Sequence, residues 1–286
     1  MSDTAPVIET LKTHYDITSI FHIEEISGHS GDTTFKIVTA DKRYIVKITK
    51  NKTDTFFRTY QYVSTHLEAT LPRIILTNQN ACCHQSELGT FFVTEYIDGQ
   101  SMEFTACRAK LLARKVARLH SIPKNSALNH WNLDSLFHDI EYDRLVQLAE
   151  TDKDFLLHQL KLAKKLAELP ESVVHGDLGL SNILMTPAGD VTILDWGGCG
   201  IGPRLLDVGY VFWNLLDDRL NFNEGAGKAF MDAYLLTIDL LASERELIVS
   251  ACILFPMNYV LFDSDTKIRK IEWFVDHKHL LQSLVT

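Results

Sequence analysis

The spacing of apolar residues divides the chain into a strand-rich part and a helix-rich part. In the first part, short runs of alternating apolar and polar residues lie between turn residues, which is typical of half-buried strands. The strands predicted from these runs are Ile17–Ile26, Thr34–Val38, Tyr44–Ile48, Leu71–Thr77 and Phe91–Ile97. Two helices are predicted among them, Pro6–Tyr15 and Asp54–Glu68.

In the rest of the chain, apolar residues recur three and four positions apart, as on one face of a helix. In the segment that begins at Ser243, Glu246 is expected to complete a capping box and Pro256 to kink or split the helix. We therefore expect two domains, residues 1–98 and residues 99–286. The helices predicted in the second domain are Phe104–His120, Leu136–Glu150, Asp154–Leu169, Leu206–Leu216, Gly227–Leu241, Ser243–Phe262 and Lys267–Leu284.

A lysine within a predicted strand is the first candidate for chemistry. Lys47 lies in Tyr44–Ile48, and because side chains alternate between the two faces of a strand, it shares a face with Ile45. A lysine in that position is either a solvated residue of an edge strand or the partner of an anion. The strand alone favours the solvated interpretation, and the segment described next favours the anion.

The segment from Val173 to Asp207 carries the polar residues that suggest a reaction. Its two short apolar runs predict strands, and the loop between them carries Asp177 and Asn182, while Asp195 follows the second run. Carboxylate and amide oxygens that converge from loops suit Mg²⁺, which leaves room for water and phosphate ligands. A further carboxylate that is not bound to the metal can accept a proton from a substrate hydroxyl.

Three motifs in this segment are similar to a known pattern. They are H-G-D-x-x-x-x-N at His175–Asn182, I-L-D-W ending at Trp196 and G-P-R-L-L-D at Gly202–Asp207. The segment resembles the catalytic segment of the aminoglycoside phosphotransferase and choline kinase superfamily, the small-molecule relatives of protein kinases. The resemblance implies an α+β, bilobal, protein-kinase-like fold: an N-terminal lobe with an antiparallel sheet and a helix, and a larger, mostly helical C-terminal lobe.

The resemblance also implies an activity and a set of roles. The activity is transfer of the γ-phosphoryl of ATP, with Mg²⁺, to a hydroxyl of a small molecule. Asp177 would be the catalytic base that orients that hydroxyl, and Asn182 and Asp195 would hold the metal. His175 and Asp207 would support the structure of the site.

The nucleotide would be held by the first domain. The resemblance implies that Lys47 pairs with the α- and β-phosphates. A loop would cover the phosphates, and backbone groups at the end of a strand would bind the adenine edge. The residues in these two positions are Gly28, Ser30 and Gly31 in the loop, and Glu95 and Ile97 at the strand end.

The sequence departs from the family pattern at two positions. Kinases hold the strand lysine with a glutamate on the following helix, but the expected mid-helix positions carry other residues, so either Glu68 serves or the lysine is held differently. Two residues after the base, where kinases carry a lysine, this chain has Gly179. The charge that neutralises the moving phosphoryl group must then come from the metal, the backbone or another side chain, for which Arg204 is a candidate.

The acceptor is not specified by these motifs. The superfamily serves aminoglycosides, choline or ethanolamine, homoserine, methylthioribose and ketosamines. In this family the late helices build the acceptor site, and each polar or aromatic candidate there is more often a core or solvated residue than a substrate contact. The candidates are Trp213, Asp217, Asp218, Tyr259, Phe262, Asp263 and Trp273.

Composition and charge narrow the function classes. The net charge is −9 and no Lys/Arg-rich stripe is present, so we expect no nucleic-acid partner. The five cysteines include no C-x-x-C pair, so neither a disulfide framework nor a zinc site is expected. No apolar run approaches the ~20 residues of a membrane span and no signal peptide is recognised, so we expect no membrane partner and a cytoplasmic location. The oligomeric state is left open.

Two other functions compete with a small-molecule kinase. A kinase-fold protein that binds a nucleotide or metabolite without transfer is favoured slightly by Gly179, by the unplaced helix glutamate and by a phosphate loop with just two glycines. The joint presence of Lys47, Asp177, Asn182 and Asp195 argues against it. A protein kinase is disfavoured, because P-R-L-L-D follows Asp195 within twelve residues and leaves little room for an activation loop.

Overall fold

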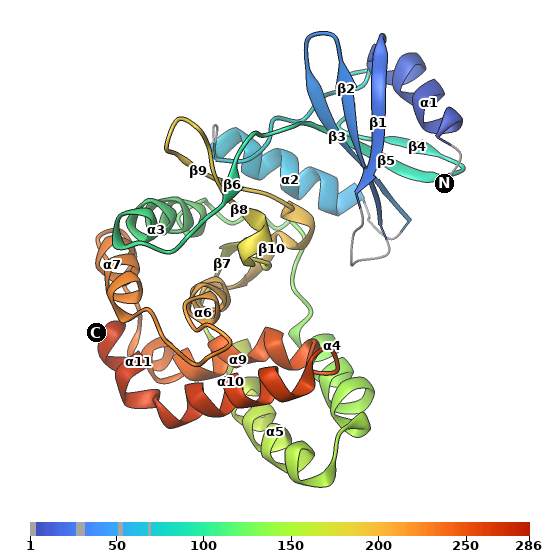
Figure 1. The fold of residues 1–286 in the computed structure, drawn as a ribbon. Helices are drawn as coiled ribbons and strands as arrows, with labels where there is room; N and C mark the ends of the chain where they lie inside the picture. Colours follow the sequence, from blue (N-terminus) through green and yellow to red (C-terminus); the bar gives the residue numbers. More distant parts are fainter. Residues whose placement is uncertain (1–3, 27–31, 51–53, 68–69) are drawn as a thin grey trace. The chain divides into compact units, whose positions relative to one another are not determined.

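The protein has an α+β fold with an antiparallel sheet and many helices (Figure 1). The structure is a computed structural model that describes residues 4–26, 32–50, 54–67 and 70–286. Two compact units make up the chain. The first comprises Met1–Gln100 with Thr186–Ala188, and the second comprises Ser101–Met185 with Gly189–Thr286.

The first unit is built on an antiparallel sheet in the order β1-β2-β3-β5-β4. Residues in β2 and β3 alternate in burial, as expected for strands that place one face on a core. The strands are β1 (Ile20–Ile26), β2 (Thr33–Thr39), β3 (Arg43–Thr49), β4 (His84–Ser86) and β5 (Gly89–Glu95).

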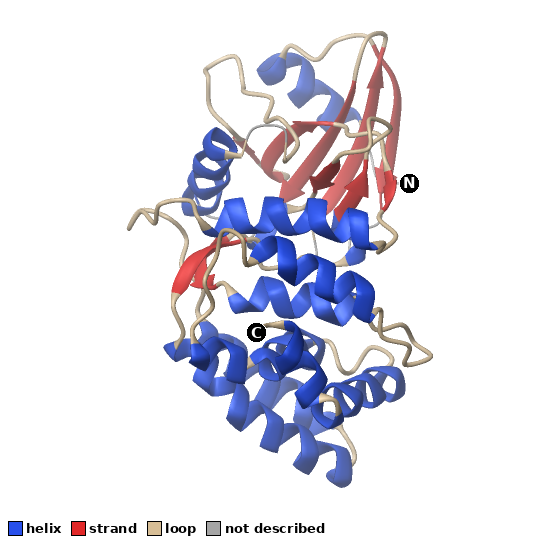
Figure 2. Ribbon diagram, turned by 90° about the vertical axis from the view of Figure 1, so that its left-hand side faces the viewer, coloured by secondary structure: helices blue, strands red, loops and turns tan. Residues whose placement is uncertain are grey.

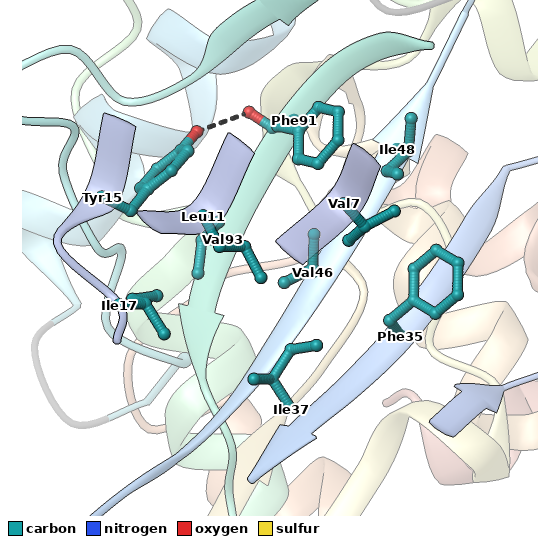
Figure 3. Packing of buried hydrophobic residues seen from close by; sticks show 10 residues of the cluster. All are labelled: Val7, Leu11, Tyr15, Ile17, Phe35, Ile37, Val46, Ile48, Phe91 and Val93. Carbon is teal, nitrogen blue, oxygen red and sulfur yellow. Dashed lines mark hydrogen bonds between the residues drawn. The ribbon is translucent and has the colours of Figure 1, made fainter. Parts of the chain in front are cut away.

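Helix α1 (Ala5–Tyr15) packs on one face of this sheet (Figure 3). Pro6 begins the helix, where its missing N–H costs no hydrogen bond, and Asp16 ends it in a left-handed conformation with φ 53°. The Tyr15 hydroxyl donates to the carbonyl of Phe91 at 2.9 Å. The buried core between the helix and the sheet consists of Val7, Leu11, Tyr15, Ile17, Phe35, Ile37, Val46, Ile48, Phe91 and Val93.

The other face of the sheet packs against α2 (Asp54–His66). Rings of this helix contact Phe92 of β5, with Tyr60 edge-to-face at 4.8 Å and Phe57 at 5.5 Å between ring centroids. In the register of β3 and β5, Lys47 is opposite Phe92, so the lysine lies on the face that α2 covers. Val46 and Ile48 lie on the α1 face, as the alternation predicts.

The second unit is mostly helical, with short strands (Figure 2). Strand β7 (Glu171–Val174) pairs with β10 (Gly200–Pro203), and β8 (Ile183–Met185) pairs with β9 (Val191–Ile193). The short strand β6 (Gln100–Ser101) lies at the sequence boundary between the units. The helices are α3 (Ala106–His120), α4 (Leu133–His138), α5 (Glu150–Ala163), α6 (Leu205–Asn214), α7 (Glu224–Tyr234), α8 (Ala242–Glu246), α9 (Ile248–Asn258), α10 (Ser264–Asp276) and α11 (Lys278–Leu284). Among the described helices, none combines the length and apolar character that a membrane crossing needs.

Helices α6 and α9 pack closely in the core of the second unit. A Cβ atom added to Gly209 of α6 would lie 2.3 Å from the backbone carbonyl carbon of Ala251 in α9. Only a glycine permits this approach of the two backbones. The next residue of α6, Tyr210, lies at the same crossing, with its ring 5.4 Å from the ring of Phe255 of α9.

Several predicted elements were wrong in extent or type. Leu71–Thr77 is not a strand, because only Ile74 forms a bridge, to Thr94. The predicted helix Leu136–Glu150 is replaced by α4, the π-helical turn η1 (Asp139–Arg144) and a 3₁₀ turn. These short turns carry apolar residues at helical spacing, so periodicity alone does not distinguish them from an α-helix.

The late helices are also shorter than predicted. The segment Ser243–Phe262 breaks at Leu247, and Pro256 lies in the last turn of α9. The predicted capping pair is wrong, since the carboxylate of Glu244 accepts from the Leu241 N–H at 2.9 Å. The segment Lys267–Leu284 likewise breaks at His277.

Candidate active site

The loop that follows β7 is shaped by a glycine and a tryptophan. Gly176 has φ +81°, and a Cβ atom added there would lie 2.0 Å from Cζ2 of Trp131. The Trp131 indole N–H donates to the carbonyl of Gly198 at 2.8 Å, which fixes the ring against the loop. Glycine is therefore required at 176 both for the backbone conformation and for the space.

A buried carboxylate holds the start of this loop. Asp207, which is 1% exposed, accepts the backbone N–H of His175 at 2.7 Å on Oδ2 and that of Gly176 at 2.8 Å on Oδ1. The ring of His120 lies 3.1 Å from the same Oδ2, and because a carboxylate only accepts, His120 Nε2 donates. Burial alone would raise the pKa of Asp207, but the hydrogen bonds from His120 and from the backbone of His175, with the electrostatic interaction of both residues, lower it.

His120 is in turn fixed by a second partner. Its Nδ1 lies 2.7 Å from the hydroxyl of Tyr234, and both residues are buried. Since Nε2 carries the proton that Asp207 accepts, a neutral ring accepts the tyrosine proton at Nδ1. His120 thus acts on the loop through Asp207 as part of the buried framework.

His175 links the loop to the strand before Asp195. The backbone N–H of Asp177 donates to His175 Nδ1 at 3.1 Å, so Nδ1 is an acceptor. The proton of a neutral ring is then on Nε2, which lies 2.9 Å from the carbonyl of Leu194 and donates to it. The ring of Trp196 packs edge-on against His175 at 4.7 Å.

Asn182 is oriented by Asp177. Its Nδ2 donates to Oδ2 of Asp177 at 2.9 Å and to the Asp177 carbonyl at 3.0 Å. Because the amide nitrogen is used in this way, the amide oxygen of Asn182 points away from the carboxylate. That oxygen is the group that a hard cation would take as a ligand.

Asp195 has a backbone conformation that is rare for its residue type. Its φ and ψ are 47° and 65°, and its exposed side chain accepts the N–H of Gly197 at 3.3 Å. Non-glycine residues in this left-handed region are uncommon and cluster at functional sites.

Asp177 and Asp195 lie within electrostatic range of each other. Burial raises the pKa of Asp177, and the negative charge of Asp195 raises it further. His175 and the hydrogen bond from Asn182 act in the opposite direction without reversing the shift. The backbone N–H of Leu194 donates to the carbonyl of Asn182 at 2.7 Å, so Asp195 directly follows a residue bonded to the loop that carries Asp177.

The donor set fits Mg²⁺ better than a metal held by protein ligands alone. Among the described residues, no group of three or more His, Cys, Asp or Glu side chains is arranged to hold a metal ion. The site offers two oxygen ligands, the amide oxygen of Asn182 and the exposed carboxylate of Asp195. Mg²⁺ commonly binds one or two protein oxygens and fills its remaining coordination positions with water and phosphate oxygens.

In the first unit, Lys47 has an acidic partner. Its Nζ lies 3.5 Å from Oδ2 of Asp32, and the two side chains are 22% and 7% exposed. The sequence left the partner open, although the register offers a signal: Lys47 pairs with Thr34, and Asp32 is two positions earlier on the same face. The other predicted residues of this region, Glu68, Gly28, Ser30 and Gly31, lie outside the described residues.

Two backbone N–H groups at the strand end predicted to bind adenine form hydrogen bonds within the first unit. The N–H of Glu95 donates to the carbonyl of Arg73, and that of Tyr96 donates to the carbonyl of Arg43. The Glu95 carboxylate pairs with Arg73 at 2.8 Å. Of the three backbone N–H groups from 95 to 97, that of Ile97 is the one that these bonds do not use.

Two residues of α6 contact the catalytic loop and were missed by the sequence analysis. Tyr210 interacts electrostatically with Asp177, and Asn214 Nδ2 donates to the carbonyl of Leu178 at 2.7 Å. The signal was their spacing from Asp207: residues three and seven positions apart share one face of a helix. Tyr259 also interacts electrostatically with Asp177. Burial is the largest cause of the raised pKa of Tyr259, and the charge of Asp177 is the next largest.

Most of the predicted acceptor residues have structural partners. Asp217 accepts from Asn221 within a turn, and Asp218 lies 3.6 Å from Lys270. Asp263 is the left-handed residue before α10. The aromatic candidates belong to a ring cluster in which Trp213 stacks on Phe274 and Trp273 stacks on Phe222 and His277.

Arg204 does not supply a free charge. Its guanidinium pairs with Glu244 through two bonds of 2.8 Å and donates to the carbonyl of Asp239 at 2.6 Å. The suggestion that it neutralises the moving phosphoryl group is therefore wrong.

The comparisons with known proteins agree with this geometry. A family model described as the phosphotransferase enzyme family matches residues 22–247. No match was found among curated proteins.

Similar solved structures include several small-molecule kinases. A spectinomycin phosphotransferase in complex with ADP and spectinomycin is 14% identical with a TM-score of 0.72, covering 98% of this chain and 97% of its own. An amicoumacin kinase in complex with AMP-PNP, Ca²⁺ and Ami is 14% identical with a TM-score of 0.74, covering 97% and 93%. The choline kinase LicA from Streptococcus pneumoniae is 16% identical with a TM-score of 0.68, covering 96% and 98%. At these identities the likeness shows the fold, that of protein-kinase-like small-molecule kinases.

Proposed function

Because the chain belongs to the phosphotransferase enzyme family, we propose that it transfers the γ-phosphoryl of ATP to a hydroxyl of a small molecule. The observation that carries this proposal is the arrangement of Asp177, Asn182 and Asp195 in the second unit. Nucleotides and a divalent ion in the structures of similar kinases support the choice of ATP and Mg²⁺ as cofactors.

Asp177 acts on the acceptor. Its carboxylate accepts a hydrogen bond from the acceptor hydroxyl and orients the oxygen toward the γ-phosphorus. As the new O–P bond forms and the bond to the ADP oxygen breaks, the hydroxyl proton passes to Asp177. Such transfer depends mainly on positioning and charge neutralisation, so the proton moves late.

Asn182 and Asp195 hold the metal. The amide oxygen of Asn182 and the exposed carboxylate of Asp195 are the two protein ligands of Mg²⁺ in this proposal. When bound, the ion neutralises charge on the phosphate oxygens and fixes their orientation.

The first unit binds the rest of the nucleotide. Lys47 pairs with the α- and β-phosphates, and Asp32 takes the place of the helix glutamate that other kinases use to hold the lysine. The backbone at Glu95 and Ile97 binds the adenine edge, with the Ile97 N–H as the donor.

Turnover with a panel of acceptors tests this function. Purified protein, ATP and Mg²⁺ are incubated with hydroxylated amines, sugars and amino alcohols, and ADP release is compared with and without acceptor. Asp177→Asn is expected to lower turnover ~10²–10⁴-fold with little change in ATP binding, the scale of a lost general base. The matched control is Asp154→Asn, an exposed position of α5 that should keep full activity.

Either of two results would contradict the proposal. One is wild-type turnover in Asp177→Asn. The other is ADP release that no acceptor of the panel increases, together with tight ATP binding. That result would favour the alternative, a kinase-fold protein that binds nucleotide or metabolite without transfer. Gly179 is the feature that favours that alternative.

A further inference from the structure

Arg144 carries a buried donor that the fold does not use. Its side chain is partly exposed, but its Nε is shielded from solvent and has no hydrogen-bond partner, the one buried side-chain nitrogen or oxygen in this state within the described part of the chain. No ion pair joins its guanidinium to an acid of the described residues, and Glu141, three positions earlier, pairs with Lys164 at 2.8 Å. Buried polar groups are almost always paired, and each exception needs a physical explanation, such as a group that binds there.

The turn that carries Arg144 packs on a helix of the catalytic region. Arg144 ends η1, and the N–H of Leu145 donates to the carbonyl of Ile140 five residues earlier, which is the hydrogen bond of a π-helix. Such turns are rare and recur at functional sites. This turn contacts helix α9.

Helix α9 connects η1 with the loop that carries Asp177. The ring of Phe255 in α9 lies 5.4 Å from Tyr210 and 5.3 Å from Trp131, the ring that is fixed against that loop. Cε1 of Tyr210 and Oδ1 of Asp177 lie 3.5 and 3.7 Å from one point, the position of a Cβ atom added at Gly179. One helix therefore separates η1 from the residues around the proposed base.

The end of the same helix agrees with this placement. Tyr259 follows α9 one turn after Phe255, and its side chain is half exposed. Burial raises the pKa of Tyr259, the charge of Asp177 raises it further, and the charge of Arg144 lowers it. The phenol is thus within electrostatic range of both charged residues.

A guanidinium with an unpaired Nε suits an anion. Nε and a terminal nitrogen of arginine present two parallel N–H groups, which match two oxygens of a carboxylate or a phosphate. The acids expected to bind a cationic acceptor are already engaged, Asp217 with Asn221 and Asp218 with Lys270. The net charge of −9 does not attract anions, so binding of an anion needs a dedicated cation.

We propose that Arg144 binds an anionic group of the acceptor, so that the acceptor is a hydroxyl compound that also carries a carboxylate or a phosphate. This inference rests on the proposed function, because it names the substrate class of that reaction. Arg144 holds the anionic end of the acceptor, and the hydroxyl is presented to Asp177. Cationic acceptors are disfavoured, because they would meet an unpaired positive charge.

Turnover with matched pairs of acceptors tests the proposal. Each hydroxy acid is compared with its amide and each phosphate monoester with its parent alcohol, the smallest pairs being glycerate with glyceramide and glycerol 3-phosphate with glycerol. The anionic member of the best pair should have a kcat/KM about 10–100-fold higher, the scale of hydrogen bonds to a charged group. Which kind of pair shows the preference tells a carboxylate from a phosphate.

Substitution of the arginine should remove this preference. Arg144→Met keeps the hydrocarbon stem and should bring the two members of the pair within about threefold, mainly by raising KM for the anionic one. Arg144→Lys keeps the charge without the fork and should keep part of the preference. The matched control is Arg114→Met, at an exposed position of α3, which should behave as wild type.

Three results would overturn the inference. One is a wild-type enzyme that prefers neutral or cationic acceptors, and another is an unchanged preference in Arg144→Met. The third is a fall of kcat in Arg144→Met that is equal for charged and neutral acceptors, because the arginine would then act on the transferred phosphoryl group.

A binding measurement needs no turnover. The same compounds are titrated calorimetrically into the protein with AMP-PNP and Mg²⁺, and an anionic compound should bind wild type and Arg114→Met at least about tenfold more tightly than Arg144→Met. Equal affinities, or no anionic compound that binds, would overturn the inference. Binding that depends on Arg144 without turnover on any acceptor would overturn the proposed function alone.

Thermal stability distinguishes a binding arginine from a structural one. Since the buried Nε has no hydrogen bond to lose, Arg144→Met should melt no lower than Arg114→Met in the absence of ligands. A clearly lower Tm would show that the guanidinium serves the fold, which would overturn the inference.

Discussion

Replacing Asp207 by asparagine should weaken both the fold and the catalytic loop. In the native protein, Oδ2 accepts from His175 N–H and from His120, and Oδ1 accepts from Gly176 N–H. An asparagine has one acceptor oxygen, and its NH₂ group would face a donor at the other position. The orientation that costs least keeps the bonds of Oδ2 and leaves the N–H of Gly176 without an acceptor.

The expected loss follows from these contacts. A buried donor without an acceptor costs about 1–3 kcal/mol, and the loss of the charge on the acceptor weakens the bond from His120 further. We therefore expect Asp207→Asn to lower the free energy of unfolding by about 2–4 kcal/mol at pH 7. Denaturant unfolding followed by circular dichroism measures the difference, with Asp154→Asn as the exposed control, expected within about 0.5 kcal/mol of wild type.

The effect should depend on pH with a defined sign. The pKa of Asp207 is lower in the folded protein than in the unfolded chain, so its contribution is fully present above the unfolded value of about 3.9 and is lost as the pH falls through the folded value. The gap between wild type and Asp207→Asn should therefore be constant from pH 7 to about pH 5 and shrink in more acidic solution. A gap below about 1 kcal/mol at pH 7, or one that widens in acid, would refute the reasoning.

Two further predictions concern the metal and the helix crossing. Asp195→Ala should abolish Mg²⁺-dependent ATP binding in a calorimetric titration, because it removes the charged ligand; unchanged affinity would reject Asp195 as a ligand. Gly209→Ala should destabilise the protein by at least about 1–3 kcal/mol, since its Cβ would lie 2.3 Å from Ala251, whereas Gly225→Ala, with 3.9 Å to its nearest neighbour, should be neutral or stabilising in a thermal melt. Equal Tm changes in the two variants would contradict the close approach of α6 and α9.

The fold class could be predicted because three short motifs between His175 and Asp207 resemble those of a family whose fold they imply. The loop from His175 to Asn182 carries its own turn chemistry, and the alternation around Lys47 places its neighbours correctly. Element boundaries depend on tertiary packing. Leu71–Thr77 has the apolar pattern of a strand, yet it forms a single bridge, at Ile74.

The partners within the site were harder to predict. Asn214 was assigned to a helix, but nothing in the sequence states that its amide bonds to the carbonyl of Leu178, thirty-six residues earlier. Arg204 was suggested as the charge that neutralises the phosphoryl group, and the sequence does not reveal that it pairs with Glu244, forty residues away. Tertiary packing determines which residues far apart in the sequence contact each other, so these pairs are seen in the structure and do not follow from residue spacing.

The central claim is that Asn182 and Asp195 ligate the magnesium ion of a bound nucleotide. A crystal structure with Mg²⁺ and a non-hydrolysable ATP analogue tests it most directly. We predict that Asn182 and Asp195 ligate the ion and that the Lys47 amine contacts nucleotide phosphates. A nucleotide bound without Lys47, or an ion that neither Asn182 nor Asp195 touches, would contradict the account.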